Sequence, residues 1–328
     1  LLLLFWLAAN MLETPRDIRA LLVIIVATCL MSSAVGIVET FTGLRILGIT
    51  TTWREDATRL VGASQVNPNT FATNVMVALF VALYFAFTSR NLALRLLLFG
   101  TAALLTLTVA LSLSRGATLV YILTMLYLLF RLRRQLPWPA LIVVCGLLLL
   151  CVLPFIPQEY YERIRTLFTE TATDNSLLRR QAYNTIGMKL FLRSPVWGVG
   201  PGSFRTYFTS EEFRYVANTF GWPRLLHNLY LSIACQLGLL GFGFFTGLVV
   251  YTFRDLLAVG RSDRSDSPPF LVHAARAVEI ALVAFLLNSV FLPNEYQKYM
   301  WVMFAMSVAM ARMHSAADAE PAQAASAE

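Results

Sequence analysis

Long apolar runs separated by short polar segments follow one another along the whole chain. Most runs approach the 20 or so residues that a helix needs to cross the hydrocarbon core of a bilayer. None has the short alternating pattern of a transmembrane barrel strand. The pattern therefore predicts an all-α, polytopic helical membrane protein with about nine spans. The predicted spans are Leu1–Asn10, Ala20–Phe41, Phe71–Phe87, Leu96–Leu113, Thr118–Phe130, Trp138–Phe155, Leu229–Phe253, Phe270–Leu292 and Tyr299–Met313.

The apolar run Leu96–Phe130 is too long for one span. As a single helix it would measure about 52 Å, against a hydrocarbon core of about 30 Å. It would also place Arg115 near the middle of the bilayer, at a cost of roughly 2.5–3.5 kcal/mol. We therefore predict two spans joined by a tight turn at Ser114–Arg115–Gly116, in which glycine permits the turn and Arg115 reaches the interface.

The distribution of arginine predicts which loops face the cytoplasm. Alternate connections are short and arginine-rich, as the positive-inside rule expects of cytoplasmic loops. The opposite, periplasmic face then receives the Arg115 turn and one loop of unusual length, residues 156–226. This gives transmembrane helices at 1–155, a large periplasmic loop with short helices at 156–226, further transmembrane helices at 227–313, and a disordered cytoplasmic tail at 314–328. Because the chain opens inside an apolar run, we expect its N-terminus to be truncated.

Composition narrows the functional classes. The chain is 57% hydrophobic and only 14% charged, with a mean hydropathy of +0.63, which excludes an ordinary soluble domain. The net charge of +7 comes almost entirely from arginines between the spans, so it indicates topology or anionic lipid-linked ligands rather than nucleic acid. All four cysteines lie inside apolar runs and form no Cys-x-x-Cys pair, which is typical of small packing residues.

The long outer loop has recognisable local structure. Ser176 is a suitable N-cap for a helix that continues to about Leu192, with an apolar stripe at Tyr183, Ile186 and Leu190. The glycine-rich segment Gly198–Phe204 follows. It lacks the strand and the lysine of a phosphate-binding loop, so we interpret it as a tight turn.

His227 is the strongest candidate for chemistry. It lies at the end of the long loop, at the predicted mouth of the next span, with Asn228 and Tyr230 nearby in sequence. An imidazole with a pKa near 6.5 can accept a proton from a hydroxyl at periplasmic pH. A buried structural histidine is the alternative.

Arg115 and Arg180 are candidates for binding a diphosphate, because a guanidinium group matches phosphate oxygens with two parallel hydrogen bonds. Arg179 competes with Arg180 for this role. The alternative for Arg115 is an interfacial anchor, and for Arg180 a solvated helix face.

Acidic residues do not predict a metal site. The outer face has no His-Glu-x-x-His motif and no carboxylate cluster near His227. Within the spans, Glu279 follows Arg276 by three residues, and we expect these two to form an ion pair on one helix face.

Several short motifs, in this order, resemble the O-antigen ligase and O-antigen polymerase superfamily. Arg180 is followed by Leu190–Phe204 (LFLRSPVWGVGPGSF), His227–Leu231 (HNLYL) and Gln236–Gly241 (QLGLLG). The earlier stretches Arg59–Gly62 (RLVG), Asn67–Ala72 (NPNTFA) and Ser114–Ala117 (SRGA) also fit the pattern.

The resemblance implies an integral glycosyltransferase of the bacterial inner membrane with its active site facing the periplasm. Such a protein needs no metal or other cofactor. It moves a glycan from undecaprenyl diphosphate to an acceptor hydroxyl, here on lipid A-core, with inversion at the anomeric carbon. The resemblance implies that His227 is the essential loop histidine and that Arg115 and Arg180, or Arg179, hold the diphosphate. Asn228, Tyr230, Arg59 and Asn69 are expected to line the site.

Other functions of the same superfamily remain open at this point. A polymerase that extends an O-antigen or an exopolysaccharide uses the same parts, with the growing glycan as acceptor, and transfer to protein is a further variant. A bicarbonate-type membrane transporter is the alternative from another class. A carrier should have charged groups near the middle of the membrane, and the predicted spans contain few.

Overall fold

The computed structural model describes residues 1–44, 51–54, 57–60, 67–133, 135, 175–213, 225–261 and 269–325, and positions 142, 143, 146, 150, 153–156, 158, 160, 161 and 165. Its residues form two compact units. Unit 1 comprises Leu1–Tyr160, Thr252–Phe285 and Lys298–Glu328, and unit 2 comprises Tyr161–Tyr251 and Leu286–Gln297. Unit 2 thus contains most of the predicted periplasmic loop, from residue 161, together with parts of the chain that we assigned to the C-terminal spans.

Helices account for almost all of the described structure, as predicted. Unit 1 contains α1 (Leu2–Met11), α2 (Pro15–Thr42), α3 (Pro68–Thr88), α4 (Leu92–Leu111), α5 (Arg115–Leu132), the short η1 (Leu153–Phe155), α12 (Pro269–Asn288) up to Phe285, α13 (Lys298–Ala325) and the end of α11 (Leu229–Gly260). Unit 2 contains α8 (Asn175–Arg193), α9 (Phe204–Phe208), η2 (Glu211–Phe213), the first part of α11 and η3 (Asn294–Tyr296).

Within the described part of the chain, six helices are long and apolar enough to cross a membrane: α2, α3, α4, α5, α11 and α12. They correspond to six of the nine predicted spans. The predicted first span is the ten-residue α1, and Tyr299–Met313 lies in α13, which is not one of the six. Most of the predicted span Trp138–Phe155 lies outside the described residues. The fold is therefore that of a multi-pass helical membrane protein.

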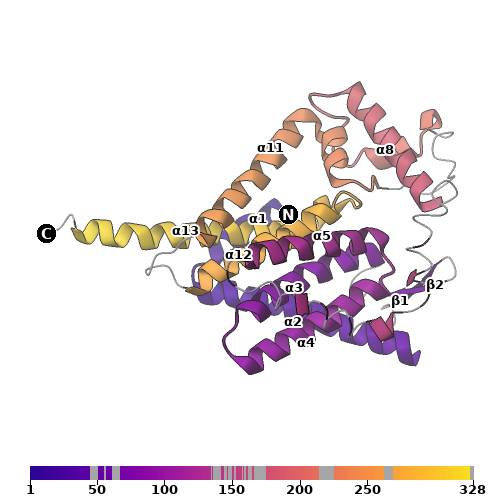
Figure 1. The fold of residues 1–328 in the computed structure, drawn as a ribbon. Helices are drawn as coiled ribbons and strands as arrows, with labels where there is room; N and C mark the ends of the chain where they lie inside the picture. The colour runs from indigo at the N-terminus through magenta and orange to yellow at the C-terminus, as the bar shows by residue number, and fades with distance from the viewer. Residues whose placement is uncertain are drawn as a thin grey trace. The chain divides into compact units, whose positions relative to one another are not determined.

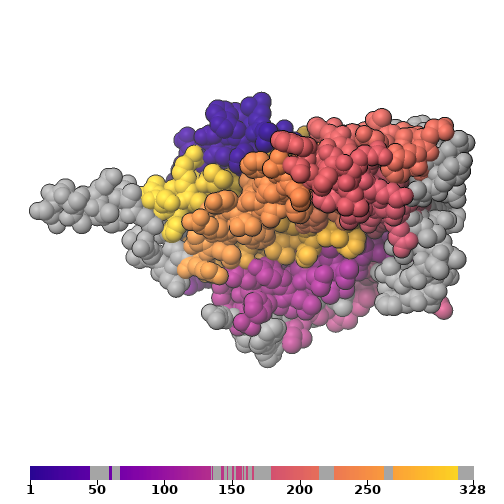
Figure 2. Space-filling model, turned by 90° about the horizontal axis from the view of Figure 1, so that it is seen from above, coloured from indigo at the N-terminus to yellow at the C-terminus, as the bar shows by residue number. Residues whose placement is uncertain are grey.

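The centre of unit 1 is α3. Nearly every residue of this helix is buried, which is typical of a helix that is apolar on all sides and enclosed by other helices. Its neighbours α2, α4 and α5 lie beside it in Figure 1. The short α1 packs against α13, through the ring contact of Phe5 with Trp301, and Figure 2 shows the two as adjacent indigo and yellow surfaces.

The predicted break in the run Leu96–Phe130 is present, two residues earlier than expected. Helix α4 ends at Leu111, and Leu113 adopts a left-handed conformation with φ 51°. Ser114 then caps α5 by accepting a hydrogen bond from the Ala117 amide at 3.3 Å. The predicted turn at Ser114–Arg115–Gly116 is therefore wrong in position: Arg115 opens α5, and a leucine makes the turn that we assigned to Gly116.

One small element was not predicted. The strands β1 (Thr51–Arg54) and β2 (Ala57–Leu60) form an antiparallel hairpin in which Thr51 pairs with Leu60 and Arg54 with Ala57. Four-residue strands give too short an alternation to stand out from a polar loop.

The C-terminal tail also differs from the prediction. We expected disorder from residue 314, but α13 continues to Ala325. Alanine, the residue with the highest helix propensity, dominates this segment, so the chain extends the preceding helix.

The core of unit 2 forms around α8. As predicted, Tyr183, Ile186 and Leu190 are buried along one face of this helix. They pack with aromatic residues of the following segment, with Leu226 and with Cys235 in α11; the aromatic residues are Phe204, Phe208 and Phe213. The helix begins at Asn175, one residue before the position at which we placed its N-cap.

Helix α11 is interrupted at Gly238, where φ is 67° and ψ is −169°. The glycine-rich turn fills the break. The amides of Val199 and Gly200 donate to the carbonyls of Cys235 and Gln236 at 2.9 and 3.0 Å. On the other side of the break, the amide of Leu239 donates to Pro195 O at 2.7 Å, and that of Leu240 to Val196 O at 3.3 Å. The tight turn predicted at Gly198–Phe204 is confirmed, and it supplies the hydrogen bonds that the broken helix lacks.

Candidate active site

The His227 ring is held by two contacts within unit 2. Its Nδ1 lies 2.8 Å from the carbonyl oxygen of Leu225, and the ring stacks on Tyr183 with centroids 5.3 Å apart and an interplanar angle of 27°. A carbonyl oxygen only accepts hydrogen bonds, so Nδ1 must carry a proton. The neutral ring then has its lone pair on Nε2, as a general base requires.

Helix α8 positions the segment that carries His227. Tyr183 provides the stacking surface, and Gly187, one turn further along, allows Leu226 to approach closely. A Cβ at position 187 would lie 2.3 Å from the Leu226 side chain. The apolar stripe of α8 thus packs in the core of unit 2 and, through Tyr183, also orients the candidate base.

Arg179 and Arg180 lie on the same helix, four and three residues before Tyr183, and both are half-buried. Three to four residues of α-helix correspond to a rise of about 4.5–6 Å, so both arginines lie one turn from the residue on which His227 stacks. The structure therefore brings the α8 arginines and the histidine into the same unit, and both arginines remain candidates.

Arg115 lies in unit 1 as the first residue of α5. The positive end of the helix dipole and the first backbone amides of α5 are located here, which favours a negatively charged partner. Nearby, the Tyr160 hydroxyl donates to Thr118 Oγ1 at 3.0 Å.

The side chains of Arg59 and Asn69, both predicted to line the site, are in contact, and Arg59 has a structural role. The Arg59 guanidinium donates from Nη2 to Asn69 Oδ1 at 2.9 Å and from Nε to Ser112 O at 2.8 Å. The side chain is buried, with 8% of its surface exposed. Arg59 therefore ties the β-hairpin and the start of α3 to the break that precedes Arg115.

Asn228 and Tyr230, the other two predicted lining residues, make backbone contacts. Asn228 caps α11 by accepting from the Leu231 amide at 3.1 Å. The Tyr230 hydroxyl donates to Leu286 O at 2.8 Å. Both contacts hold the start of α11 in place, directly after His227.

The sequence pattern does not reveal a polar group that lines a cavity of unit 2. Ser232, Gln236 and Glu295 line a cavity of about 320 Å³ in unit 2, together with Leu225 and its neighbour Leu226. Glu295 lies in a short loop that the hydropathy pattern identifies only as a connection. The spacing of Ser232 and Gln236, four residues apart at a helix start, was the one available signal.

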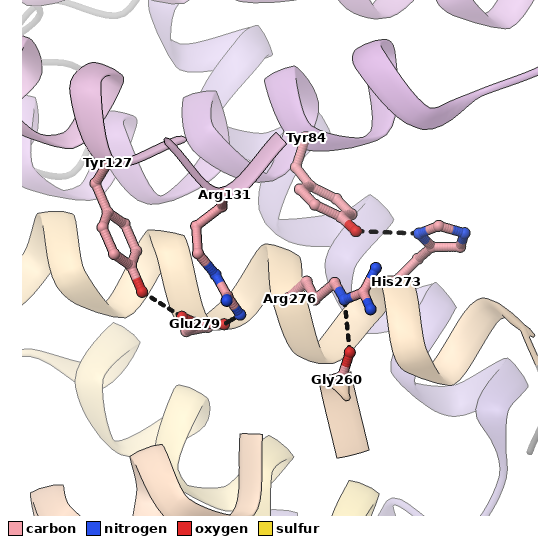
Figure 3. A network of polar contacts seen from close by, with 7 residues as sticks. All are labelled: Tyr84, Tyr127, Arg131, Gly260, His273, Arg276 and Glu279. Atoms are coloured by element: carbon pink, nitrogen blue, oxygen red, sulfur yellow. Dashed lines mark hydrogen bonds and ion pairs between the residues drawn. The ribbon is translucent and has the colours of Figure 1, made fainter. Parts of the chain in front are cut away.

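Unit 1 contains a separate buried cluster, shown in Figure 3, that corrects one prediction. The fully buried Glu279 pairs with Arg131 at 2.5 Å and accepts a hydrogen bond from the Tyr127 hydroxyl. Arg276, the partner that we expected, instead donates to Gly260 O at 2.6 Å.

The cluster in Figure 3 continues at His273, whose Nδ1 lies 3.1 Å from the Tyr84 hydroxyl. Arg276 and Glu279 are three residues apart on α12, a spacing that permits an ion pair. Glu279 nevertheless pairs with Arg131 of α5.

Comparison with known families agrees with these motifs. Residues 100–246 match the O-antigen ligase family. The match extends from α4 through Arg115, Arg180 and His227 to residue 246, past the break in α11, and it confirms the resemblance. Arg59, Asn69 and Glu295 lie outside it. The family is associated with ligase and polymerase activity of the glycosyltransferase type and with lipid-linked glycan substrates in a membrane. No curated protein matches the chain.

Proposed function

We propose that the protein is an inverting, metal-independent glycosyltransferase that moves a glycan from undecaprenyl diphosphate to an acceptor hydroxyl of lipid A-core, on the periplasmic face of the bacterial inner membrane. The observation that carries the proposal is the hydrogen bond of 2.8 Å between His227 Nδ1 and Leu225 O, because it sets the tautomer that a general base needs. The family match over residues 100–246 supports the substrate class.

In the proposed reaction, His227 Nε2 takes the proton from the acceptor hydroxyl as its oxygen attacks the anomeric carbon of the donor. The bond from that carbon to the diphosphate oxygen breaks on the opposite face, and undecaprenyl diphosphate leaves with the electron pair. Displacement from the opposite face inverts the anomeric configuration. Stacking on Tyr183 and the bond to Leu225 keep the imidazole oriented throughout.

The proposed diphosphate ligands are Arg115 and one of the two α8 arginines, with Arg180 preferred. Charge grows on the diphosphate as it leaves, and fixed guanidinium groups stabilise such charge without reorganisation. The position of Arg115 at the N-terminus of α5 adds the favourable end of the helix dipole. A diphosphate is already an activated leaving group, so no paired carboxylates are required, in contrast to ordinary glycoside hydrolysis.

Transfer from purified donor to purified lipid A-core, in detergent and in EDTA, tests the proposal. We expect glycan-bearing lipid A-core whose new linkage has the inverted anomeric configuration by NMR. Activity that EDTA abolishes and a divalent cation restores would contradict the metal-free mechanism, and retention of configuration would contradict direct displacement. Extension of the donor glycan itself, with lipid A-core unused, would make the protein a polymerase with the same chemistry.

A further inference from the structure

Unit 2 encloses a cavity that the proposed reaction does not yet use. Its volume of about 320 Å³ lies at the lower end of the range for small-molecule sites, about 300–1,000 Å³. A space of this size suits one sugar ring better than an oligosaccharide. The lining combines aromatic residues, Phe204 and Tyr296, with the side chains of Arg205, Ser232, Gln236 and Glu295.

The polar lining forms a directed chain of hydrogen bonds. The Gly202 amide donates to Gln236 Oε1 at 2.5 Å, and Gln236 Nε2 donates to Ser232 Oγ at 2.7 Å. Ser232 Oγ in turn donates to Glu295 Oε1 at 2.8 Å. Each of these hydrogen bonds is donated in the direction of the Glu295 carboxylate. The series therefore fixes the position of that carboxylate and favours its charged form.

Burial of Glu295 favours the neutral form of its carboxyl group instead. It raises the pKa of the Glu295 carboxyl above its ordinary value, although the hydrogen bonds from the backbone and from Ser232 lower it. An ionised carboxylate has about four acceptor positions, and Ser232 uses one of them. A carboxylate kept in a partly enclosed, polar cavity is suited to accept hydrogen bonds from neutral donors such as hydroxyl groups.

The composition of the lining matches a sugar. A sugar ring presents several hydroxyl donors at its edge and an apolar face to an aromatic ring. Glu295 accepts from hydroxyls, Arg205 donates to ring or hydroxyl oxygens, and Phe204 and Tyr296 offer apolar surface. Leu225, whose carbonyl orients His227, also lines the cavity, so the cavity shares a residue with the segment that holds the candidate base.

We propose that this cavity binds one sugar ring of the acceptor glycan, with Glu295 as the group that accepts its hydroxyl hydrogen bonds and with Ser232 and Gln236 as residues that position Glu295. The assignment to the acceptor, rather than the donor, rests on the proposed function, because the base must lie next to the acceptor hydroxyl. It assigns a specificity site to a loop outside the segment that matches the family.

The main test compares Glu295→Gln with Glu212→Gln in the full chain. Gln keeps the shape and the Ser232 hydrogen bond but removes the charge. Glu212 is a control carboxylate in the same unit, exposed and paired with Arg193 at 2.6 Å. We expect Glu295→Gln to raise the KM for lipid A-core by about 10-fold to 100-fold, with the donor KM within twofold of wild type, because hydrogen bonds to charged groups are strong. An unchanged acceptor KM, or a rise in the donor KM alone, would overturn the proposal.

A binding measurement separates this proposal from the proposed function. Saturation-transfer NMR on the purified chain, without donor, uses free glucose, galactose and heptose as probes. We expect at least one of these sugars to bind and Ser232→Ala and Glu295→Gln to weaken that binding, whereas Glu212→Gln leaves it unchanged. Sugar binding without any glycan transfer would refute the proposed function and leave the sugar site standing. Transfer by the wild type, with no binding of these sugars or with equal binding by all variants, would refute the sugar site and leave the proposed function standing.

Discussion

Two breaks in apolar helices show two ways of completing a broken helix. Between α4 and α5, in unit 1, side chains supply the missing partners: Ser114 caps α5, and Arg59 donates to Ser112 O. At Gly238 of α11, in unit 2, the backbone of residues 195–200 supplies them. Irregular backbone at membrane depth is tolerated only where protein or water satisfies it. Each break lies beside a candidate functional residue, the first before Arg115 and the second after Gln236.

The two solutions differ in how well they tolerate substitution. Hydrogen bonds between two backbone segments require the segments to approach each other closely. A Cβ at Gly238 would lie 2.1 Å from the Val196 carbonyl oxygen. A side-chain partner can be shortened or exchanged at a smaller cost. The glycines of the second break are therefore expected to be far more sensitive than the polar side chains of the first.

The largest effect on stability is expected for Gly238→Ala. The backbone conformation there is nearly restricted to glycine, so strain alone costs on the order of 3 kcal/mol, and the clash with Val196 adds to it. Hydrogen exchange at the Leu239 and Leu240 amides should become fast. Gly243→Ala is the matched control, because no atom lies within 4 Å of its Cβ position. Equal exchange in both variants would show that the turn does not complete the helix.

A smaller effect is expected for Arg59→Lys. An ammonium group keeps the charge but cannot donate to Ser112 O and Asn69 Oδ1 together, which leaves one buried acceptor unsatisfied at a cost of about 1–3 kcal/mol. Thermal unfolding in detergent measures the loss. Arg90→Lys, at an exposed position between α3 and α4, should leave the unfolding temperature unchanged. A similar unfolding temperature for both variants would show that the hydrogen bonds of Arg59 do not stabilise the first break.

Ser114→Ala tests the cap of the same break. Loss of a helix N-cap costs about 1 kcal/mol. The same unfolding assay should therefore show a smaller decrease than for Arg59→Lys. A decrease as large as that of Gly238→Ala would contradict the difference between the two breaks.

The smallest effect concerns Glu295, near the second break. Because burial raises the pKa of this carboxyl in the folded state, its stabilising contribution is complete below the unfolded pKa and is lost as the pH rises through the folded value. Raising the pH from 4 to 7 therefore reduces this contribution to stability. Glu295→Gln should unfold at a slightly higher temperature than wild type at pH 7, and this gain should vanish near pH 4. A lower unfolding temperature at pH 7 would show that the charge stabilises the fold.

Sequence alone predicted the helical membrane class and the first break, because hydrophobic run length and one central arginine are local signals. It did not predict the second break, since the partners of Gly238 lie about 40 residues earlier in the chain. The predicted pairing of Glu279 with Arg276 was wrong for the same reason, because its observed partner, Arg131, is distant in sequence. His227 could be found because its position at a span mouth is visible in the hydropathy pattern. Glu295 could not, because only tertiary packing brings its loop to Ser232.

The rate of glycan transfer by His227→Ala tests the role of His227 as the general base most directly. The variant should insert and unfold like wild type, because the ring is only half-buried. With purified donor and lipid A-core, we expect a decrease in rate of about 10²–10⁴-fold, the usual cost of removing a general base. Transfer at a rate near that of the wild type would contradict the assignment of His227 as the base.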